Sequence, residues 1–263
     1  MEFKFDANQE FQVQAVDAIC DLFDGLIHVQ AQVSFNAGTF TLASIANRLD
    51  LDAVTLLKNL QDVQHQNGIR PDERLEYIEE IIQTADGEKA ARFPNFSIEM
   101  ETGTGKTYVY LRTILKLNKR YGMRKFIIVV PSVAIREGVL KTLKVTAKHF
   151  RELFGNPVYR YYRYDSANLT QVRQFAQSDG VEIMVMTLDS FNKGSNVIRQ
   201  STDRLQGEVP LYLVQASRPI LILDEPQNME SEKALTALAM LDPLMTLRYS
   251  ATHRNPYNVV YRL

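Results

Sequence analysis

The sequence has few of the features that secreted and membrane proteins need. Its 263 residues include a single cysteine, Cys20, so no disulfide can form within the chain. No stretch approaches the ~18 consecutive apolar residues of a membrane-spanning helix. Residues 1–11, MEFKFDANQEF, carry acids and lack the apolar run of a signal peptide. We therefore expect a protein of a reducing, cytoplasmic compartment with no membrane partner.

Two further absences limit the metal sites and the architectures that we expect. The four histidines, at positions 28, 65, 149 and 253, show no spacing typical of a metal site, so we assign no zinc. The chain also has no internal repeat and no low-complexity tract. Its 45% hydrophobic content is enough for one large α/β core, or for a core with a small satellite domain.

Positive charge is concentrated in one part of the chain. Residues 112–173 contain 14 Lys and Arg against three acids, about +11, whereas the rest of the chain carries about −12. Within this basic segment, Lys141, Lys144 and Lys148 recur at spacings of three and four, which places them in one stripe on a helix. Such a segment favours a polyanion such as DNA as a partner. The alternative is an ordinary solvated helix face.

Hydrophobic periodicity divides the chain into three parts. Residues 1–25 include a helix whose apolar side chains share one face. Residues 26–95 have the pattern of two or three amphipathic helices, so we expect a helical insertion there. Across residues 96–263, helices alternate with apolar strands, which we expect at 96–101, 125–131, 157–165, 181–187, 219–225 and 245–252. This alternation predicts an α/β fold with a mainly parallel sheet and helices on both faces.

The stretch SIEMETGTGKTYVY, residues 97–110, has most of a phosphate-binding loop. Gly105, Lys106 and Thr107 match the end of G-x-x-x-x-G-K-[ST], but Met100 takes the place of the leading glycine. Glycines let backbone N–H groups approach phosphate oxygens, the lysine can reach the β and γ phosphates, and the threonine hydroxyl can bind Mg²⁺. We predict an ATP and Mg²⁺ site formed by Thr102, Gly103, Thr104, Gly105, Lys106 and Thr107. The alternative is a glycine turn that opens an ordinary helix.

A second motif, LILDEPQ, lies at residues 221–227. An apolar strand that ends in two adjacent acids is what a Walker B element requires. Asp224 would then hold Mg²⁺ through water, and Glu225 would orient or deprotonate the attacking water. A simple strand cap is the alternative. The motif follows the glycine-rich loop by about 120 residues with further strands between them, which favours the Walker B interpretation.

Three motifs, METGTGKT, DEPQ and SAT, occur in that order. Together they resemble motifs I, II and III of superfamily 2 helicases and translocases, in which motif I often lacks the leading glycine. The segment FQVQAV, residues 11–16, is similar to the Q-motif of this group, which implies that Gln12 recognises adenine. The resemblance further implies catalytic roles for Lys106, Asp224, Glu225 and Gln227, and coupling roles for Ser250 and Thr252.

Longer segments make the resemblance more specific. Four segments together resemble the Res subunit of type III restriction enzymes: NFSIEMETGTGKTYVYLRTI, KFIIVVPSVAIREGVL, DEPQNM and SATHRNPYN. The resemblance covers residues 1–24 and 96–263. It implies a RecA-like P-loop NTPase domain of an ATP-driven motor on duplex DNA, with a modification (methyltransferase) subunit as partner. It also implies DNA-backbone contacts from Pro131, Ser132, Arg136 and Thr187, although ordinary loop residues are an alternative for these four.

A full Res subunit also has a second motor domain with an arginine finger, and a nuclease domain. Neither fits before Leu263, so we expect only the first motor domain, with the rest of its own chain as a further partner and with little turnover by itself. Two alternatives stay open. The chain could be a nucleotide-binding docking scaffold without turnover, or the first domain of another superfamily 2 DNA helicase.

Overall fold

The computed structural model describes residues 5–28, 31–37, 40–202, 205 and 207–263. Its α-helices are α1 (Glu10–Asp21), α2 (Ala53–Gln66), α3 (Lys106–Tyr121), α4 (Val133–Phe154), α5 (Thr170–Gln177), α6 (Pro210–Ala216) and α7 (Glu232–Ala239). Among the described residues, no helix is both long enough and apolar enough to cross a membrane.

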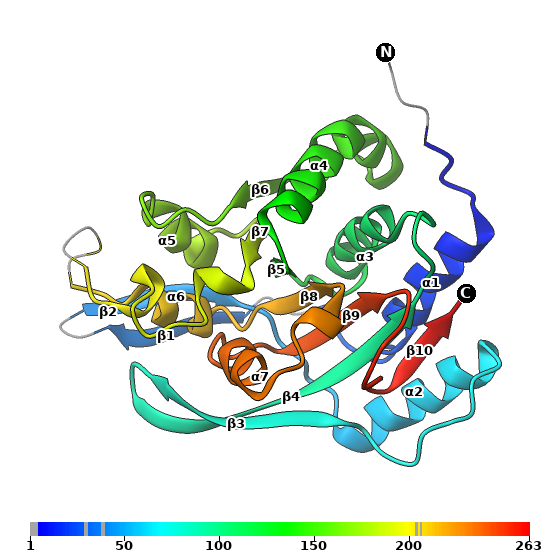
Figure 1. The fold of residues 1–263 in the computed structure, drawn as a ribbon, viewed down its shortest axis with the longest axis horizontal. Coiled ribbons are helices and arrows are strands. Elements are labelled where there is room, and N and C mark those ends of the chain that lie inside the picture. Colours follow the sequence, from blue (N-terminus) through cyan, green and yellow to red (C-terminus); the bar gives the residue numbers. More distant parts are fainter. Residues whose placement is uncertain (1–4, 29–30, 38–39, 203–204, 206) are drawn as a thin grey trace.

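The strands build one large sheet and one small one (Figure 1). They are β1 (Ala31–Ala37), β2 (Phe40–Ala46), β3 (Tyr77–Thr84), β4 (Gly87–Glu99), β5 (Lys125–Val130), β6 (Tyr159–Arg163), β7 (Val181–Thr187), β8 (Ile220–Asp224), β9 (Met245–Ser250) and β10 (Val259–Arg262). The large sheet has the order β10-β4-β9-β8-β5-β7-β6, with all of these neighbours parallel, and β3 pairs antiparallel with β4. The prediction of a mainly parallel sheet is confirmed.

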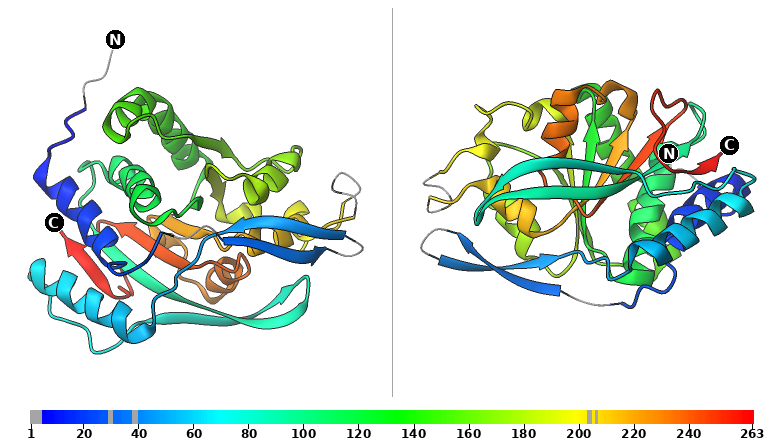
Figure 2. Two further views of the ribbon diagram at one scale, coloured as in Figure 1. Left: turned by 180° about the vertical axis from the view of Figure 1, so that it is seen from behind. Right: turned by 90° about the horizontal axis from the view of Figure 1, so that it is seen from below.

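Helices cover both faces of this sheet (Figures 1 and 2). Strand β5 shows why residues 126–130 are continuously apolar. Phe126, Ile128 and Val130 pack in the core that α1, α3 and α4 share, whereas Ile127 and Val129 pack in the core of α5, α6 and α7. A parallel strand buried on both faces has no position that favours a polar side chain. The predicted covering of both faces is confirmed.

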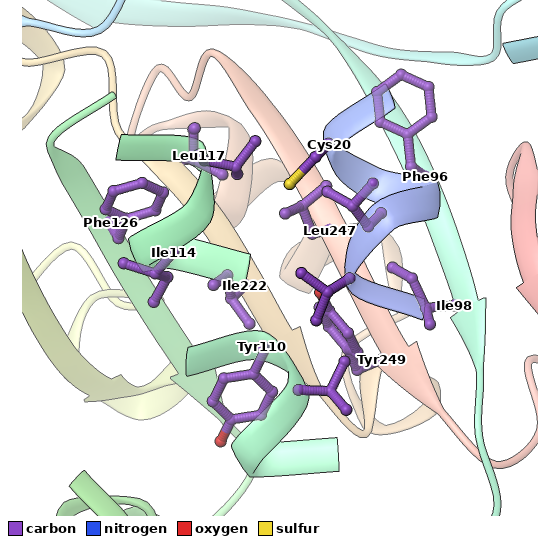
Figure 3. Packing of buried hydrophobic residues seen from close by; sticks show 14 of the residues in the cluster. Cys20, Phe96, Ile98, Tyr110, Ile114, Leu117, Phe126, Ile222, Leu247 and Tyr249 are labelled. Carbon is purple, nitrogen blue, oxygen red and sulfur yellow. The ribbon is translucent and has the colours of Figure 1, made fainter. Parts of the chain in front are cut away.

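Helix α1 is held firmly against α3, as Figure 3 shows around Cys20 and Leu117. The Cys20 thiol is fully buried, and burial raises its pKa to about 12, so it stays neutral. At the rim of the contact, Lys116 pairs with Asp17, and Arg120 of α3 pairs with Asp21 at 2.6 Å. The N-terminal helix is thus part of the main core, where it lies close to the start of α3.

The prediction that residues 26–95 form a helical insertion is wrong. Within the described part of this segment only α2 is an α-helix, while β1 and β2 form one antiparallel pair, and β3 and β4 form another. The expected boundary at residues 95 and 96 falls inside β4. The buried residues Ile78 and Ile82 are four apart, a spacing that suits one face of a helix and one face of a strand equally well. The dipeptide Asp86-Gly87 is a hairpin signal that separates the two interpretations.

Candidate functional site

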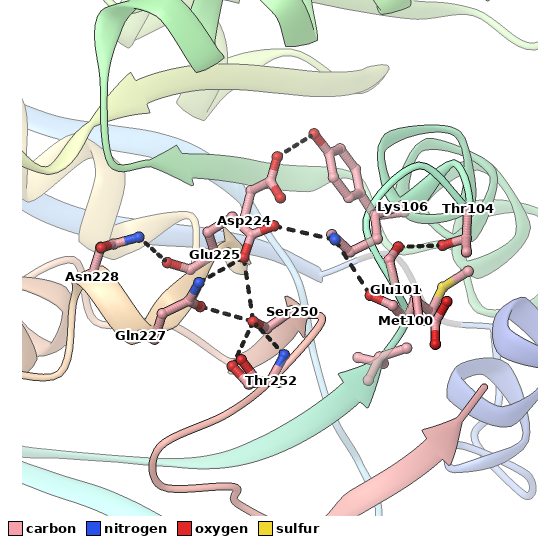
Figure 4. A network of polar contacts seen from close by, with 12 residues as sticks. Met100, Glu101, Thr104, Lys106, Asp224, Glu225, Gln227, Asn228, Ser250 and Thr252 are labelled. Carbon is pink, nitrogen blue, oxygen red and sulfur yellow. Dashed lines mark hydrogen bonds and ion pairs between the residues drawn. The ribbon is translucent and has the colours of Figure 1, made fainter.

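Three loops meet at the carboxyl edge of the large sheet (Figure 4). They follow β4, β8 and β9, and β9 lies between the other two strands. Because neighbouring parallel strands end at the same edge, motifs that are far apart in sequence come together there. The glycine-rich loop, the acid pair and the SAT motif therefore lie together at this edge.

The loop from Met100 to Gly105 turns sharply into α3. The Glu101 carbonyl accepts hydrogen bonds from the Thr104 hydroxyl at 2.7 Å and from the Thr104 backbone N–H at 3.4 Å. Gly103 and Gly105 have φ angles of +85° and +86°, a region that disfavours side chains. Thr102 and Gly103 are exposed at the tip, so their backbone groups are accessible to an anion at the start of α3.

Gln12 of α1 supports this loop directly. Its Nε2 atom donates to the Thr104 carbonyl at 2.9 Å, and a Cβ atom on Gly105 would lie only 2.7 Å from the same nitrogen. The structure therefore places Gln12 with the predicted phosphate loop and gives a second reason for glycine at position 105. Adenine recognition by Gln12 stays a prediction.

Lys106 and Glu225 form a largely buried ion pair across the site. The Lys106 side chain is 9% exposed, and its Nζ lies 3.2 Å from Glu225 Oε1. The same nitrogen donates to the Met100 carbonyl at 3.3 Å. Met100, at the position of the usual leading glycine, thus contributes its backbone oxygen to the lysine, while its side chain is buried in the core.

The two adjacent acids have pKa values shifted in opposite directions. Burial, reinforced by the neighbouring Glu225 charge, raises the pKa of Asp224 to about 6. Burial also acts to raise the pKa of Glu225, but hydrogen bonds from Gln227 and Lys106 outweigh it and hold that pKa below its ordinary value. Glu225 therefore keeps its negative charge near neutral pH, as a residue that polarises water must.

The backbone at Glu225 is held in an unusual conformation. Its φ is +57°, in the left-handed region that costs a non-glycine residue free energy. The Glu225 N–H donates to the Tyr249 carbonyl at 3.0 Å, which ties the turn to β9. The turn aims the Glu225 side chain at Lys106 and not along the strand direction.

Hydrogen bonds join the DEPQ motif, residues 224–227, to Ser250 of the SAT motif, and Ser250 to Thr252. Gln227 donates to Glu225 Oε2 at 2.7 Å. The Ser250 hydroxyl lies 2.8 Å from Gln227 Oε1 and 3.3 Å from Glu225 Oε2, and it accepts from the Thr252 N–H at 3.2 Å. Thr252 joins this network through its backbone. The network connects the acid pair to the segment after β9.

Tyr110 belongs to the site, although the sequence motifs did not indicate it. Its hydroxyl donates to Asp224 Oδ2 at 3.2 Å, and its side chain is fully buried. Burial and the Asp224 carboxylate raise the Tyr110 pKa well above its ordinary value, so the phenol remains a proton donor. The available signal was its position three residues after Thr107, on the same face of α3.

The residues expected to contact DNA lie along the same edge of the sheet, after β5 and β7. Ser132 caps α4 by accepting from the Ile135 N–H at 3.3 Å, and the Thr187 hydroxyl lies 2.9 Å from that of Ser190. Pro131 lies between β5 and Ser132. These hydrogen bonds give Ser132 and Thr187 a role within the fold that needs no DNA. Arg136 also has a local partner, since its guanidinium pairs with Glu137 Oε1 at 3.0 Å. It lines a groove of about 460 Å³ together with Arg163, Tyr164, Asp165, Ser166, Ser190, Ser195, Asn196 and Val197.

The basic segment of residues 112–173 does not form one positive surface. Several of its cations pair with acids from other parts of the chain, namely Lys116 with Asp17, Arg120 with Asp21 and Asp24, Arg160 with Glu182, and Arg173 with Glu208. Lys125 is fully buried. The stripe of Lys141, Lys144 and Lys148 does lie exposed on α4.

Comparison with known families decides the relationship. The family described as "Type III restriction enzyme, res subunit" matches residues 10–255. The chain belongs to this family. The motifs that suggested the Res resemblance thus led to the correct group.

Individual Res subunits are similar over nearly the whole chain. The Res subunit of the Escherichia coli enzyme EcoP15I is 27% identical over 99% of this chain, and that of EcoPI from Escherichia phage P1 is 28% identical over 99%. The StyLTI Res subunit of Salmonella typhimurium is 28% identical over 67%. This chain spans 27% of the length of the first two relatives and 19% of the third.

Two solved structures are more distantly similar. The SWI2/SNF2 ATPase core of Sulfolobus solfataricus, in complex with duplex DNA, is 14% identical with a TM-score of 0.38, over 60% of this chain and 27% of that one. The helicase MrfA, bound to DNA and AMPPNP, is 14% identical with a TM-score of 0.37, over 91% and 31%.

Proposed function

We propose that this chain is the ATP-binding first motor domain of a DNA translocase, acting within a type III restriction enzyme beside a modification subunit. One observation carries the proposal. The lysine that follows the glycine-rich loop lies 3.2 Å from the acid that follows β8, although the two are far apart in sequence. A nucleotide-hydrolysing site needs a lysine that reaches the β and γ phosphates close to a residue that orients the attacking water.

The Lys106–Glu225 pair suggests how the residues respond to nucleotide. A γ-phosphate in the loop competes with Glu225 for Lys106, because both are anions and the lysine is buried between them. Once Lys106 turns to the phosphates, the Glu225 carboxylate is released to accept a hydrogen bond from water. Gln227 and Ser250 continue to hold that carboxylate in place.

The residues present also fit Mg²⁺. Hard cations prefer oxygen ligands, and the Thr107 side chain and the buried Asp224 carboxylate both lie next to the Tyr110 hydroxyl. When bound, Mg²⁺ supplies neutralisation of the phosphate charge. The chain's own part is to keep Asp224 and Thr107 correctly oriented.

The direct test is nucleotide binding by Lys106→Ala. Calorimetry with a non-hydrolysable ATP analogue should show binding to the wild-type chain and none to the variant. Unchanged affinity in the variant would refute the assignment of the loop. By itself the chain should hydrolyse ATP slowly, because the arginine finger that family resemblance places on another domain is worth roughly 10³ to 10⁵ in rate.

For DNA, the groove at Arg136 and the lysine stripe on α4 support backbone contacts. Both are parts of the α4 region, and Arg163 adds a second guanidinium to the groove. Guanidinium and hydroxyl groups are typical phosphate partners. A docking scaffold without turnover, the second candidate, predicts nucleotide binding without any affinity for DNA, so a DNA titration separates the two.

A further inference from the structure

Tyr110 connects the two residues that the proposed function assigns to Mg²⁺. Its hydroxyl donates to Asp224 Oδ2 at 3.2 Å, and the Thr107 side chain interacts with the same hydroxyl. Thr107 lies in the first turn of α3 and Asp224 ends β8, so a single phenol joins the start of α3 to the end of the strand that precedes Glu225. Among the described hydrogen bonds, that from Tyr110 is the one that joins the Asp224 carboxylate to another side chain.

The Tyr110 ring is itself held in place by its neighbours. It packs edge-on against Tyr249, with ring centroids 5.5 Å apart and planes inclined by 63°. The Tyr249 hydroxyl in turn donates to the Thr113 hydroxyl at 3.3 Å, and Thr113 donates to the Val109 carbonyl at 2.9 Å. Figure 3 shows both rings between α3 and the sheet. Because Tyr110 and Tyr249 are both fully buried, their packing restricts the orientation of the Tyr110 ring.

We propose that Tyr110 is a positioning residue that orients Asp224 and Thr107 for the metal of the bound nucleotide. The inference rests on the proposed nucleotide-binding function. It adds a residue that neither the motifs nor the family similarity assigns.

The hydrogen-bonding capacity of the three groups makes this arrangement effective. A phenol donates one proton and can also accept one. With its proton on Asp224, Tyr110 can only accept from the Thr107 hydroxyl, which leaves the lone pairs of the threonine oxygen for a cation. The Asp224 carboxylate is restrained through Oδ2, so its Oδ1 keeps a fixed direction. Partners of this kind behind a metal ligand typically change metal affinity by 10- to 100-fold when they are removed.

The test compares Tyr110→Phe with Tyr249→Phe. Both changes remove one buried phenol hydroxyl from the same core, but only Tyr110 touches Asp224. Calorimetry with a non-hydrolysable ATP analogue is carried out on the 263-residue chain in EDTA and across a Mg²⁺ titration. A thermal melt of each variant in EDTA reports its folding.

We expect Tyr110→Phe to weaken the Mg²⁺ dependence of analogue binding by about 10-fold, with the EDTA affinity unchanged. Tyr249→Phe should leave both quantities as in the wild type. An unchanged Mg²⁺ dependence in Tyr110→Phe, or an equal change in both variants, would overturn the inference. If Tyr110→Phe melts early, both titrations are repeated below its melting temperature, and an unchanged Mg²⁺ dependence there overturns the inference. A wild-type chain that binds no analogue in either condition would instead refute the proposed function.

Discussion

Two regions of the molecule use charge in contrasting ways. One is the proposed nucleotide site around Lys106, Asp224 and Glu225, which we call the nucleotide edge of the sheet, and the other is the basic segment of residues 112–173. At the nucleotide edge, Lys106, Asp224 and Glu225 are few, largely buried and coupled over short distances. In the basic segment, cations are numerous, yet Lys116 and Arg120 are engaged by acids of α1. A motif with its backbone context specifies a site, whereas an excess of charge in a segment specifies no surface, because the neutralising partners come from elsewhere in the chain.

The sharpest way to test the nucleotide edge is Glu225→Gln. The amide cannot polarise water as a carboxylate does, so turnover should fall by about 10²-fold or more. Analogue affinity should hold or rise, because Lys106 loses the carboxylate that competes with phosphate. Single-turnover phosphate release and calorimetry measure the two effects. Glu232→Gln, an exposed acid at the start of α7, serves as control, and equal losses in both variants would contradict the role of Glu225.

The acid pair predicts an unusual dependence of stability on pH. Since the pKa of Asp224 is raised from 3.8 to about 6, its charged form destabilises the fold. The contribution of Asp224 to stability is therefore complete below about pH 4 and is lost as pH rises through 6. At pH 7 in EDTA, Asp224→Asn should be more stable than the wild type by up to about 3 kcal/mol, and the difference should vanish near pH 4.

Urea unfolding at both pH values measures this difference. Asp52 provides the opposite case, since the Thr55 backbone N–H bonded to its carboxylate lowers its pKa. Asp52→Asn should therefore lose stability at neutral pH and lose less as the pH falls. A destabilised Asp224→Asn at pH 7 would mean that the Asp224 charge is compensated in the fold.

The glycine-rich loop offers a matched pair of substitutions. Gly103→Ala and Gly105→Ala place a methyl group at nearly the same positive φ, which costs each roughly 1–3 kcal/mol. Only at position 105 does the new Cβ meet a neighbour, 2.7 Å from Gln12 Nε2. Gly105→Ala should therefore lose more stability and more analogue affinity, and adding Gln12→Ala should recover part of the loss. Equal effects in the two single variants would show that the contact with Gln12 is unimportant.

The smallest expected effect concerns DNA. Affinity should be weak, about 10⁻⁴ to 10⁻⁶ M, and log affinity should fall with log salt at a slope of about −0.9 per phosphate contact. Reversing the charges of Lys141, Lys144 and Lys148 should lower both affinity and slope, as measured by fluorescence anisotropy at two salt concentrations. Arg120→Glu, in the same basic segment but paired with acids, should leave DNA binding unchanged while it lowers stability. No loss in the triple variant would make the stripe a solvated face.

The sequence by itself predicted, in whole or in part, six of the eight strands of the large sheet, β4 to β9, and the motifs of the proposed nucleotide site. Runs such as residues 126–130 are apolar at every position, and a strand buried on both faces accounts for such a short run between helices. The motifs around Lys106 and Asp224 follow such strands, and parallel strands bring their ends together. The alternation of strands and helices therefore predicted the parallel sheet, and the position of each motif after a strand explains why the loops meet.

Tertiary structure decided what depends on partners distant in the chain. Residues 77–84 became a strand because β4 offers a ladder of hydrogen bonds to them, while their own spacing of isoleucines suits a helix as well. The charge of the basic segment was reduced by acids of α1, and the contact of Tyr110 with Asp224 exists only once α3 lies on the sheet. Local patterns specify which face of an element is buried, but the packing of the whole chain selects the groups that a buried or charged side chain meets.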